Sequence, residues 1–259
     1  MNTGSTTDAR PLQVRVADDL RNKIEHGDYA PGAQLPTLDE LAQTYMCSLA
    51  AIRSAMGLLR QQGLVVTQQG RGTFVRPRVK ARRHGIDRYS RSRWQGAAAK
   101  PILIAEADQQ GHTATQLIRE LAEAPAPAFI AEQLRLEPGA TVWVRRRTTL
   151  IDDRPNQLAD SYYPLDVAGT APAVREEDTG PGGGYARLED AGYTLDEIEE
   201  HLAARMPSGP ESVALDLPTG TPVVELVRTT FAAERPVEVM HCIIAADMAD
   251  FTYRFPIPD

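Results

Sequence analysis

Residues 35–75 of the chain read LPTLDELAQTYMCSLAAIRSAMGLLRQQGLVVTQQGRGTFV. This stretch predicts two short helices joined by a tight turn, then two strands at residues 64–67 and 73–75 around Gly70-Arg71-Gly72. Helix, turn, helix and hairpin in this order are typical of a winged helix-turn-helix domain, which places one helix in a groove of DNA. The stretch therefore predicts that the chain reads DNA.

The ends of the helices follow from apolar spacing and from capping residues. Residues 12–26 carry apolar side chains at helical spacing and predict a first helix. Thr37 is the expected N-cap of a second helix that ends at Tyr45. Ser48 is the expected N-cap of a third helix that runs to Gln62. This third helix is the one that such a fold presents to DNA.

The charge of the chain divides unevenly along its length. Residues 1–100 hold 16 Lys and Arg against 8 Asp and Glu, whereas residues 101–259 hold 12 against 27. A basic first part and an acidic second part favour a nucleic-acid-binding domain joined to a domain with another task. A solvated basic linker is the alternative explanation, but it does not account for the helix pattern. The length of 259 residues also favours two domains.

Other classes of protein find no support in the sequence. No apolar run approaches the roughly 18 residues of a membrane helix, and the N-terminus has no secretory pattern. Cys47 and Cys242 have no companions at metal-ligand spacing, which fits free thiols in a reducing compartment. The histidines also lack such companions. We expect a cytoplasmic, soluble protein that binds no membrane, metal or cofactor.

Residues 12–76 resemble the winged helix-turn-helix domain of the GntR family of bacterial transcription regulators. The resemblance rests on Tyr29-Ala30-Pro31-Gly32, Leu35-Pro36, Glu40-Leu41-Ala42, Ser48, Ile52-Arg53, Ala55, Leu58-Leu59, Gly63-Leu64-Val65 and Gly70-Arg71-Gly72-Thr73-Phe74-Val75. Most of these residues are structural, whatever the domain binds. The resemblance implies that residues 1–76 form the DNA-binding domain.

Several positions at which the family contacts DNA carry other residues here. The family usually has Ser-Glu-Arg after Leu-Pro, where this chain has Thr37-Leu38-Asp39. It often begins the recognition helix with Ser-Arg-x-Thr-Val-Arg, where residues 48–53 read SLAAIR. A lost arginine weakens the salt-dependent part of binding, whereas apolar side chains can contact thymine methyl groups. The expected DNA-binding residues are Thr37, Ser48, Leu49, Ala51, Arg53, Gln68, Gln69, Arg71 and Gly72.

Beyond the first domain the composition changes twice. Residues 77–100 are basic and predict a solvated linker, with added phosphate contacts as the alternative. Residues 101–259 alternate apolar strands with turns, which predicts an α+β domain with a mostly antiparallel sheet. The expected strands lie at residues 102–106, 141–151, 156–163, 222–232, 236–246 and 251–255. Residues 127–134 and, on local pattern, 194–206 read as helices.

Residues 101–257 resemble the UTRA effector-binding domain of the HutC-type branch of the same family, which has a chorismate-lyase-like fold. The resemblance rests on Leu136-x-Pro138-Gly139, Arg145, Arg147, Asp153-Arg154-Pro155, Ser161-Tyr162-Tyr163-Pro164, Gly182-Gly183-Gly184, Leu217-x-x-Gly220-Thr221-Pro222-Val223 and Arg235-Pro236-Val237-Glu238. It implies a strand over much of residues 195–204, and tertiary packing does override local propensity. It also implies that residues 101–259 bind an effector and dimerise.

The candidate effector site follows from this resemblance and from strand geometry. Arg145 and Arg147 would point to one face of a strand and can clamp an anionic group together. The alternative is that the arginines form surface ion pairs with acidic residues and that Ser161 only ends a turn. The expected effector-binding residues are Arg145, Arg147, Ser161, Tyr162, Gly183, Gly184, Glu238 and Tyr253. Phosphosugar-binding members tend to carry a carboxylate shortly before Ser-Tyr, where this chain has Ala159 and Asp160, so the ligand class stays open.

Together these features predict a DNA-binding transcriptional repressor that acts as a homodimer on a two-fold-symmetric operator. A small-molecule effector, with an anion as one candidate, would modulate its operator affinity. The alternative is a ligand-independent repressor, for example of a plasmid or mobile element, whose second domain serves dimerisation only. An enzyme is disfavoured because no acid, base and nucleophile stand in a recognisable arrangement.

Overall fold

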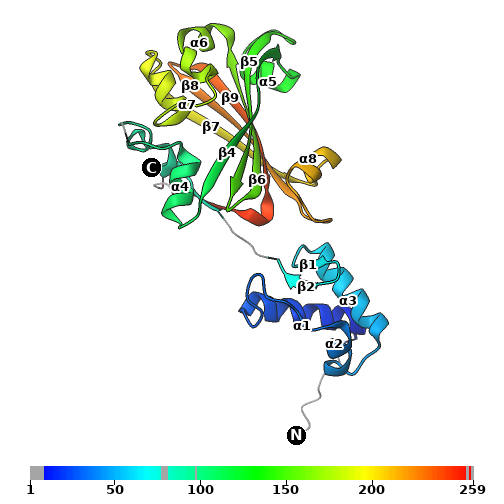
Figure 1. Cartoon of the computed structure of the whole chain (residues 1–259). Helices are drawn as coiled ribbons and strands as arrows, with labels where there is room; N and C mark the ends of the chain where they lie inside the picture. The colour runs from blue at the N-terminus through cyan, green and yellow to red at the C-terminus, as the bar shows by residue number, and fades with distance from the viewer. Residues whose placement is uncertain (1–8, 77–80, 97, 255–256, 258–259) are drawn as a thin grey trace. The chain divides into compact units, whose positions relative to one another are not determined.

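The computed structural model describes residues 9–76, 81–96, 98–254 and 257. The chain divides into two compact units, which Figure 1 colours along the sequence. The front unit comprises Met1–Arg78 with Pro218–Thr221, and the rear unit comprises Val79–Leu217 with Pro222–Asp259. Each unit has a hydrophobic core of its own, as a separate domain requires.

The described part of the front unit contains helices and a hairpin in the predicted order. The helices are α1 (Leu12–His26), α2 (Leu38–Thr44) and α3 (Leu49–Gln61). The strands β1 (Val65–Gln68) and β2 (Gly72–Val75) pair antiparallel to form the wing. These elements confirm the winged helix-turn-helix fold.

Local capping contacts set the N-terminal ends of α2 and α3. The Glu40 amide donates to the Thr37 hydroxyl at 3.3 Å, and the Thr37 amide donates to the Glu40 carboxylate at 2.7 Å. The Ala51 amide donates to the Ser48 hydroxyl at 3.2 Å. Caps of this kind typically stabilise a helix by about 1 kcal/mol. They orient the helices so that their apolar faces, including Ile52, meet in one core.

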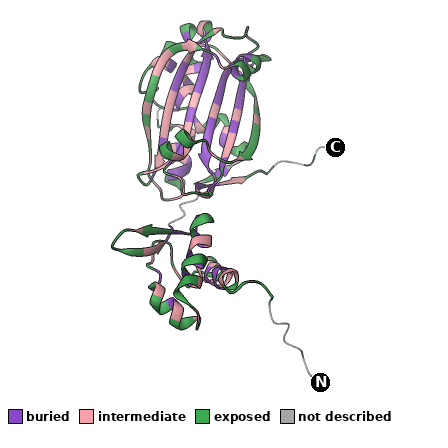
Figure 2. Cartoon of the chain, turned by 90° about the vertical axis from the view of Figure 1, so that its right-hand side faces the viewer, coloured by how far each residue is buried: buried purple, intermediate pink, exposed green. Residues whose placement is uncertain are grey.

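The rear unit is built on an antiparallel sheet in the order β4-β5-β6-β9-β8-β7. Its strands are β4 (Ala114–Pro125), β5 (Thr141–Ile151), β6 (Arg154–Pro164), β7 (Leu195–Arg205), β8 (Val223–Ala232) and β9 (Arg235–Ala245). The central strands β6 and β9 are mostly buried, whereas β4 and β7 at the two sides have almost no buried residues (Figure 2). This sheet with its helices confirms the predicted α+β class.

Helices cover both faces of the sheet (Figure 1). On one face, α5 (Ala128–Gln133) packs in a cluster that includes Tyr162. On the other face, α6 (Leu165–Thr170) and α7 (Gly183–Asp190) pack in a cluster that includes Tyr163. The two tyrosines are neighbours on β6, and successive side chains of a strand point to opposite faces.

One segment of the rear unit departs from the sequence prediction. Residues 102–106, expected as a strand, begin the helix α4 (Ile102–Gln109). The strand prediction is wrong because a short apolar run does not distinguish the two structures. The buried side chains Leu103, Glu106 and Ala107 have the spacing of one helical face.

For one segment the local sequence pattern and the resemblance to UTRA domains predict different structures. Residues 194–206 read locally as a helix but form β7, which pairs with β8 from Leu195 opposite Ala232 onward. The strand that the resemblance to UTRA domains implies is confirmed, because sheet pairing outweighs local propensity. The strand expected at 251–255 is present only at Phe251 and Thr252, which end β10 (Ala249–Thr252); residues 253–254 are not in a strand, and residue 255 lies outside the described residues.

The basic segment between the two predicted domains is structured where the structure describes it. Its elements are β3 (Ala81–His84) and the 3-10 helices η1 (Ile86–Tyr89) and η2 (Arg91–Arg93). Strand β3 pairs parallel with β10, and Trp94 is buried in the cluster around α7. Residues 81–96 are therefore ordered, with Arg83, Arg88 and Trp94 buried, although most of the other residues of this segment are solvent-exposed as predicted for a linker. Residues 77–80 lie outside the described residues.

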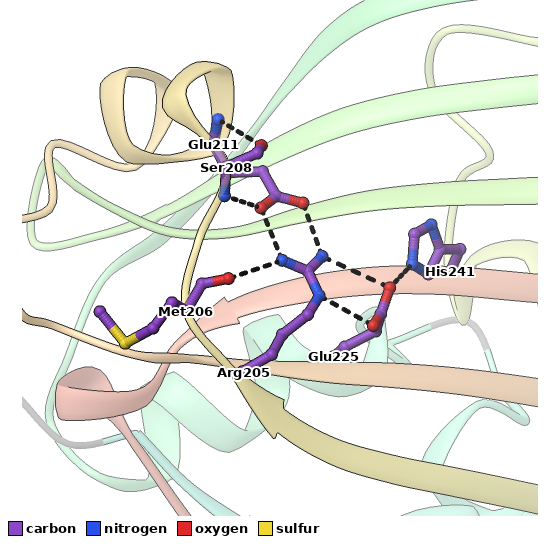
Figure 3. A network of polar contacts seen from close by, with 6 residues as sticks. All are labelled: Arg205, Met206, Ser208, Glu211, Glu225 and His241. Carbon is purple, nitrogen blue, oxygen red and sulfur yellow. Dashed lines mark hydrogen bonds and ion pairs between the residues drawn. The ribbon is translucent and has the colours of Figure 1, made fainter.

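A network of ion pairs holds α8 (Gly209–Ala214) to the sheet (Figure 3). The Arg205 guanidinium of β7 lies 2.7 Å from the Glu211 carboxylate and 2.9 Å from that of Glu225 on β8. Glu225 also lies 2.6 Å from His241 Nε2. Hydrogen bonds from Arg205 lower the pKa of Glu211 to about 2, so this carboxylate is charged near neutral pH.

Candidate functional site

The outward face of α3 presents few charges. Ile52 is buried in the core, while Leu49, Ala50 and Arg53 are exposed and Ala51 is half-buried. The helix thus offers small apolar side chains at its start and a guanidinium one turn later. Such a face can contact thymine methyl groups together with a guanine edge or a phosphate.

The wing ends in a tip whose backbone is held in place. Gly70 and Gly72 have φ angles of +73° and +117°, which residues with side chains rarely adopt. Gln34 Nε2 donates to the Arg71 carbonyl at 3.0 Å, which ties the tip to the chain before α2. The exposed Arg71 guanidinium lies 5.9 Å from the centre of the Phe74 ring. It can reach a phosphate or a narrow minor groove.

The other predicted DNA-binding residues differ in what they can offer. Thr37 and Ser48 use their hydroxyl oxygens as helix caps, so they position α2 and α3. Gln69 is exposed next to the wing tip, and Gln68 is half-buried at the end of β1. Gly72 allows the turn itself. Among the predicted residues, Leu49, Arg53, Gln69 and Arg71 have exposed side chains that no cap occupies, whereas the exposed Thr37 and Ser48 serve as caps.

The rear unit contains a cavity of about 90 Å³ on the sheet face that α7 covers. Strands β5, β6, β8 and β9 supply its floor, and the first turns of α4 and α7 supply part of its wall. Gly183 and Gly184 line it, as predicted for backbone that approaches a ligand. A cavity of this size accommodates a small polar group.

Two predicted residues, one of which lines the cavity, are hydrogen-bonded to each other. Arg147 Nη2 donates to Ser161 Oγ at 2.7 Å, from β5 to β6. Ser161 is fully buried, whereas Arg147 is half-buried and lines the cavity. Arg147 Nε has no hydrogen-bond partner among the described residues. This guanidinium therefore keeps a donor for an anionic group.

Glu238 is a buried carboxylate surrounded by donors. Tyr163 Oη donates to it at 3.0 Å and Arg228 Nη2 donates at 3.3 Å, while the Thr230 hydroxyl lies at 3.5 Å. Burial and the charge of Glu238 both raise the pKa of Tyr163, so the phenol keeps its proton. Glu238 is only 3% exposed, which excludes the role of an ordinary surface carboxylate. It orients Tyr163 and Arg228, which both line the cavity.

Two further arginines come from the basic segment before α4. Arg83 of β3 and Arg88 of η1 are each 4% exposed and line the cavity. Arg88 Nη2 lies 3.0 Å from the Glu106 carboxylate of α4. Arg83 Nη2 donates to Gln157 at a long 3.4 Å, and its Nε and Nη1 have no hydrogen-bond partner within the described residues. Burial, and then the like charge of Arg88, lower the pKa of Arg83.

The cavity is therefore rich in buried positive charge. The arginines that line it are Arg83, Arg88, Arg147 and Arg228. The carboxylates that pair with them are Glu106 and Glu238. A buried charge is costly unless it is paired and hydrogen-bonded, so this excess of guanidinium groups favours an anionic occupant.

Comparison with known proteins places this architecture in a family. The model of the bacterial regulatory proteins of the gntR family matches residues 12–75, and the UTRA domain model matches residues 109–250. The chain belongs to the GntR family. It is a DNA-binding transcription regulator whose rear unit is a UTRA domain, and members of this class are regulators rather than enzymes.

Relatives match this GntR regulator over nearly its whole length. An uncharacterized HTH-type transcriptional regulator of Streptomyces coelicolor is 34% identical over 96% of this chain and 94% of its own. The mannosyl-D-glycerate transport/metabolism system repressor MngR of Escherichia coli is 24% identical over 84% of each chain. A crystal structure assigned to the GntR family is 28% identical, with a TM-score of 0.65 over 96% of this chain and 99% of that chain.

Four residues predicted for the effector site of this GntR regulator do not line the cavity, and one of them, the fully buried Ser161, is linked to it only through its hydrogen bond with Arg147. Arg145 shares the face of Arg147 but donates to two backbone carbonyls of the segment before α7. Tyr162 points to the opposite face, into the cluster around α5. Tyr253 donates to Glu200 at 3.1 Å and borders a separate pocket. Alternation along a strand and the local fold of the chain end explain these placements.

The sequence prediction missed several residues that line the cavity. Arg83 and Arg88 stand in a basic run whose charge suggested solvent exposure. Arg228 stands within the apolar strand β8 and is stacked 5.0 Å from the Tyr185 ring centre. A lone cation in an apolar strand was the available signal for Arg228, because charged residues are rarely buried without a function or a partner.

The described residues of this GntR regulator contain neither a candidate metal site nor a candidate membrane helix. Among the residues that the structure describes, no group of three or more His, Cys, Asp and Glu side chains could hold a metal ion. Within those same residues, no helix is both long and apolar enough to span a bilayer. Cys47 and Cys242 are both free, and burial raises the pKa of the Cys242 thiol.

Proposed function

We propose that this GntR regulator represses transcription and that a small anionic effector, bound in the rear cavity, changes its affinity for the operator. The buried arginines of the cavity carry the proposal, because their charge exceeds that of the carboxylates paired with them. Repression is supported by the likeness to MngR, which is named a repressor. A bound dimer can act simply by blocking polymerase.

The contacts around the cavity suggest how an effector is held. An anionic group fits between Arg147, which is hydrogen-bonded to Ser161, and the backbone of Gly183 and Gly184, where charge-assisted hydrogen bonds are available. Tyr163 lies on the same side, and because it donates its proton to Glu238, its oxygen can accept a hydrogen bond from a hydroxyl or amine of the rest of the ligand. A carboxylate, phosphate or sulfate group satisfies this chemistry.

The DNA contacts of the proposal use the exposed residues of the front unit. Arg53 and Leu49 read base edges in the major groove, and Arg71 and Gln69 of the wing contact the backbone or the minor groove. Two chains pair through their rear units and present two such surfaces to a two-fold-symmetric operator. Strands β4 and β7 end the sheet within the described residues and offer edges for this pairing.

A ligand screen tests the function directly. Wild-type protein and Arg147→Gln are heated with a panel of anionic metabolites and with neutral analogues of the same size. We expect anionic compounds to raise the Tm of the wild type only, and the best of them to change the affinity for an operator selected from random DNA. If no anion stabilises the wild type while operator binding is intact, the protein is a ligand-independent repressor and the proposal fails.

A further inference from the structure

The strand that follows the wing is attached to the rear unit by a short pairing. Strand β3 pairs with β10 alone in a two-stranded parallel sheet, from Ala81 opposite Ala249 to His84 opposite Thr252. Parallel pairs are slightly weaker than antiparallel ones, and two-stranded sheets are marginally stable by themselves. The attachment of β3 therefore depends on what its side chains contact.

Arg83 is the residue of β3 that reaches the cavity. Its guanidinium lies 5.5 Å from the Phe251 ring centre on β10 and 3.4 Å from Gln157 Oε1. Two of its nitrogens have no hydrogen-bond partner in the described part of the chain, although the side chain is 96% buried, since only 4% is exposed. A buried charged donor without an acceptor is strongly unfavourable. The pairing of β3 with β10 therefore buries a guanidinium, that of Arg83, whose hydrogen bonds are incomplete, and this weakens the pairing.

Arg88 adds to this imbalance from the same segment. It follows β3 in η1 and has Glu106 as its carboxylate partner at 3.0 Å, while its Nε lacks a partner among the described residues. Arg83 and Arg88 also repel each other, because like charges in a poorly solvated site are weakly screened. An anion in the cavity would relieve both effects at once.

We propose that Arg83 and Arg88 are effector ligands supplied by the linker, and that the effector acts on DNA binding by fixing β3 to β10. This inference rests on the proposed anion site and adds its means of transmission. The wing ends at Val75 and β3 begins at Ala81, so at most about 21 Å of chain joins them. We call this connection between Val75 and Ala81 the tether. When β3 is fixed to β10, the end of the tether at Ala81 is fixed as well.

If the effector changes the affinity of the protein for DNA, then DNA changes its affinity for the effector by the same factor. An effector that binds the attached form of β3 more tightly than the detached form shifts the chain toward the attached form. DNA that prefers one position of the tether then changes effector affinity by the same factor. Ligand contacts made by Arg147 contribute binding but no coupling, because β5 is part of the sheet in both forms.

Hydrogen exchange with inorganic phosphate as the probe tests this inference in the full-length protein. Exchange of the backbone amides of residues 81–84 is followed with and without phosphate, alongside the Tm, in four proteins. The variants are Arg83→Gln, Arg83→Lys and Arg82→Gln, with the wild type as reference. Arg82 is the matched control, because it is the exposed neighbour of Arg83 on the same strand.

We expect phosphate to slow exchange in β3 about tenfold in the wild type and in Arg82→Gln, within the usual range of coupling. Arg83→Gln should show no slowing, even at phosphate concentrations that raise its Tm fully, and Arg83→Lys should show part of it. Equal slowing in Arg83→Gln and the wild type would overturn the inference. Circular dichroism and the exchange of β5 establish that each variant is folded.

The outcomes also separate this inference from the proposed function. If phosphate raises the Tm of the wild type and Arg147→Gln abolishes that rise, the anion site stands. Unchanged exchange of β3 in that case refutes the linker mechanism alone. If phosphate neither raises the Tm nor slows exchange in the wild type, both the anion site and the linker mechanism fail.

Discussion

The exposed face of the front unit and the cavity of the rear unit use arginine in opposite ways. Arg53 and Arg71 are exposed and solvated, so the contact that each is proposed to make with DNA would be modest and salt-dependent. Arg83 and Arg228 are buried, where an unpaired charge costs several kcal/mol. The front unit therefore depends on shape with few charges, and the rear unit depends on a concentrated charge imbalance.

The comparison also separates the charge of a domain from that of its binding site. Residues 101–259 hold 27 acidic against 12 basic residues, yet the cavity on their sheet is lined by more arginines than carboxylates, with Arg83 and Arg88 supplied by the basic segment that precedes them. The acidic side chains are mostly at the surface, where water screens them. The net charge of a domain thus indicates whether it repels a large polyanion such as DNA, but it does not indicate the charge of a small cavity inside the domain.

The largest expected effect comes from breaking a buried pair. Arg228→Met leaves the Glu238 carboxylate buried with only neutral donors, and should lower the free energy of unfolding by about 3 kcal/mol. The matched control is Arg235→Met, which breaks the exposed pair with Asp166 and should cost under about 1 kcal/mol. Urea unfolding measures both, and equal losses would contradict the contrast between buried and exposed arginines.

The exposed arginines should affect DNA binding and leave stability unchanged. If Arg53 reads a base edge as proposed, Arg53→Ala is expected to cost about 1–3 kcal/mol on the preferred operator and to relax base preference. If Arg71 contacts the DNA backbone as proposed, Arg71→Ala should weaken binding evenly across sequences and reduce the salt slope by about 1. Affinities at several salt concentrations distinguish the two. An even loss for both variants would refute a base-reading role for Arg53.

The front and rear units also differ in how much of their structure could be predicted from the sequence. In the front unit, α1 and the caps Thr37 and Ser48 are where local signals place them, because apolar spacing and capping chemistry act over a few residues. In the rear unit, β7 carries a helical pattern and is a strand only because β8 pairs with it. Local signals predict elements whose stability is local.

The cavity was only partly predictable for a related reason. Arg147 and Ser161 are on adjacent strands, and the alternation of side chains with the resemblance pointed to one face. Arg83 and Arg88 are far from them in the sequence and reach the cavity because β3 pairs with β10. No local signal distinguishes a buried arginine from a solvated one in a basic run, since burial depends on the whole fold.

The smallest expected effect concerns acid stability. The folded pKa of Glu211, about 2, lies below its ordinary value of 4.5, so its stabilising contribution is present above about pH 4.5 and is lost toward pH 2. Because the Arg205–Glu211 pair is partly solvated, this contribution is about 1 kcal/mol. Glu211→Gln should flatten the acid limb of stability against pH. An unchanged limb would mean that other carboxylates determine it.

The most direct test of the central claim is calorimetric titration of the full-length protein with inorganic phosphate near neutral pH. The cavity arginines predict saturable binding by the wild type, at least about tenfold weaker binding by Arg147→Gln, and unchanged binding by Arg119→Gln. Arg119 is an exposed arginine of β4 paired with Asp160, and serves as the matched control. Absent binding, or equal loss in the two variants, would contradict an anion site built from buried arginines.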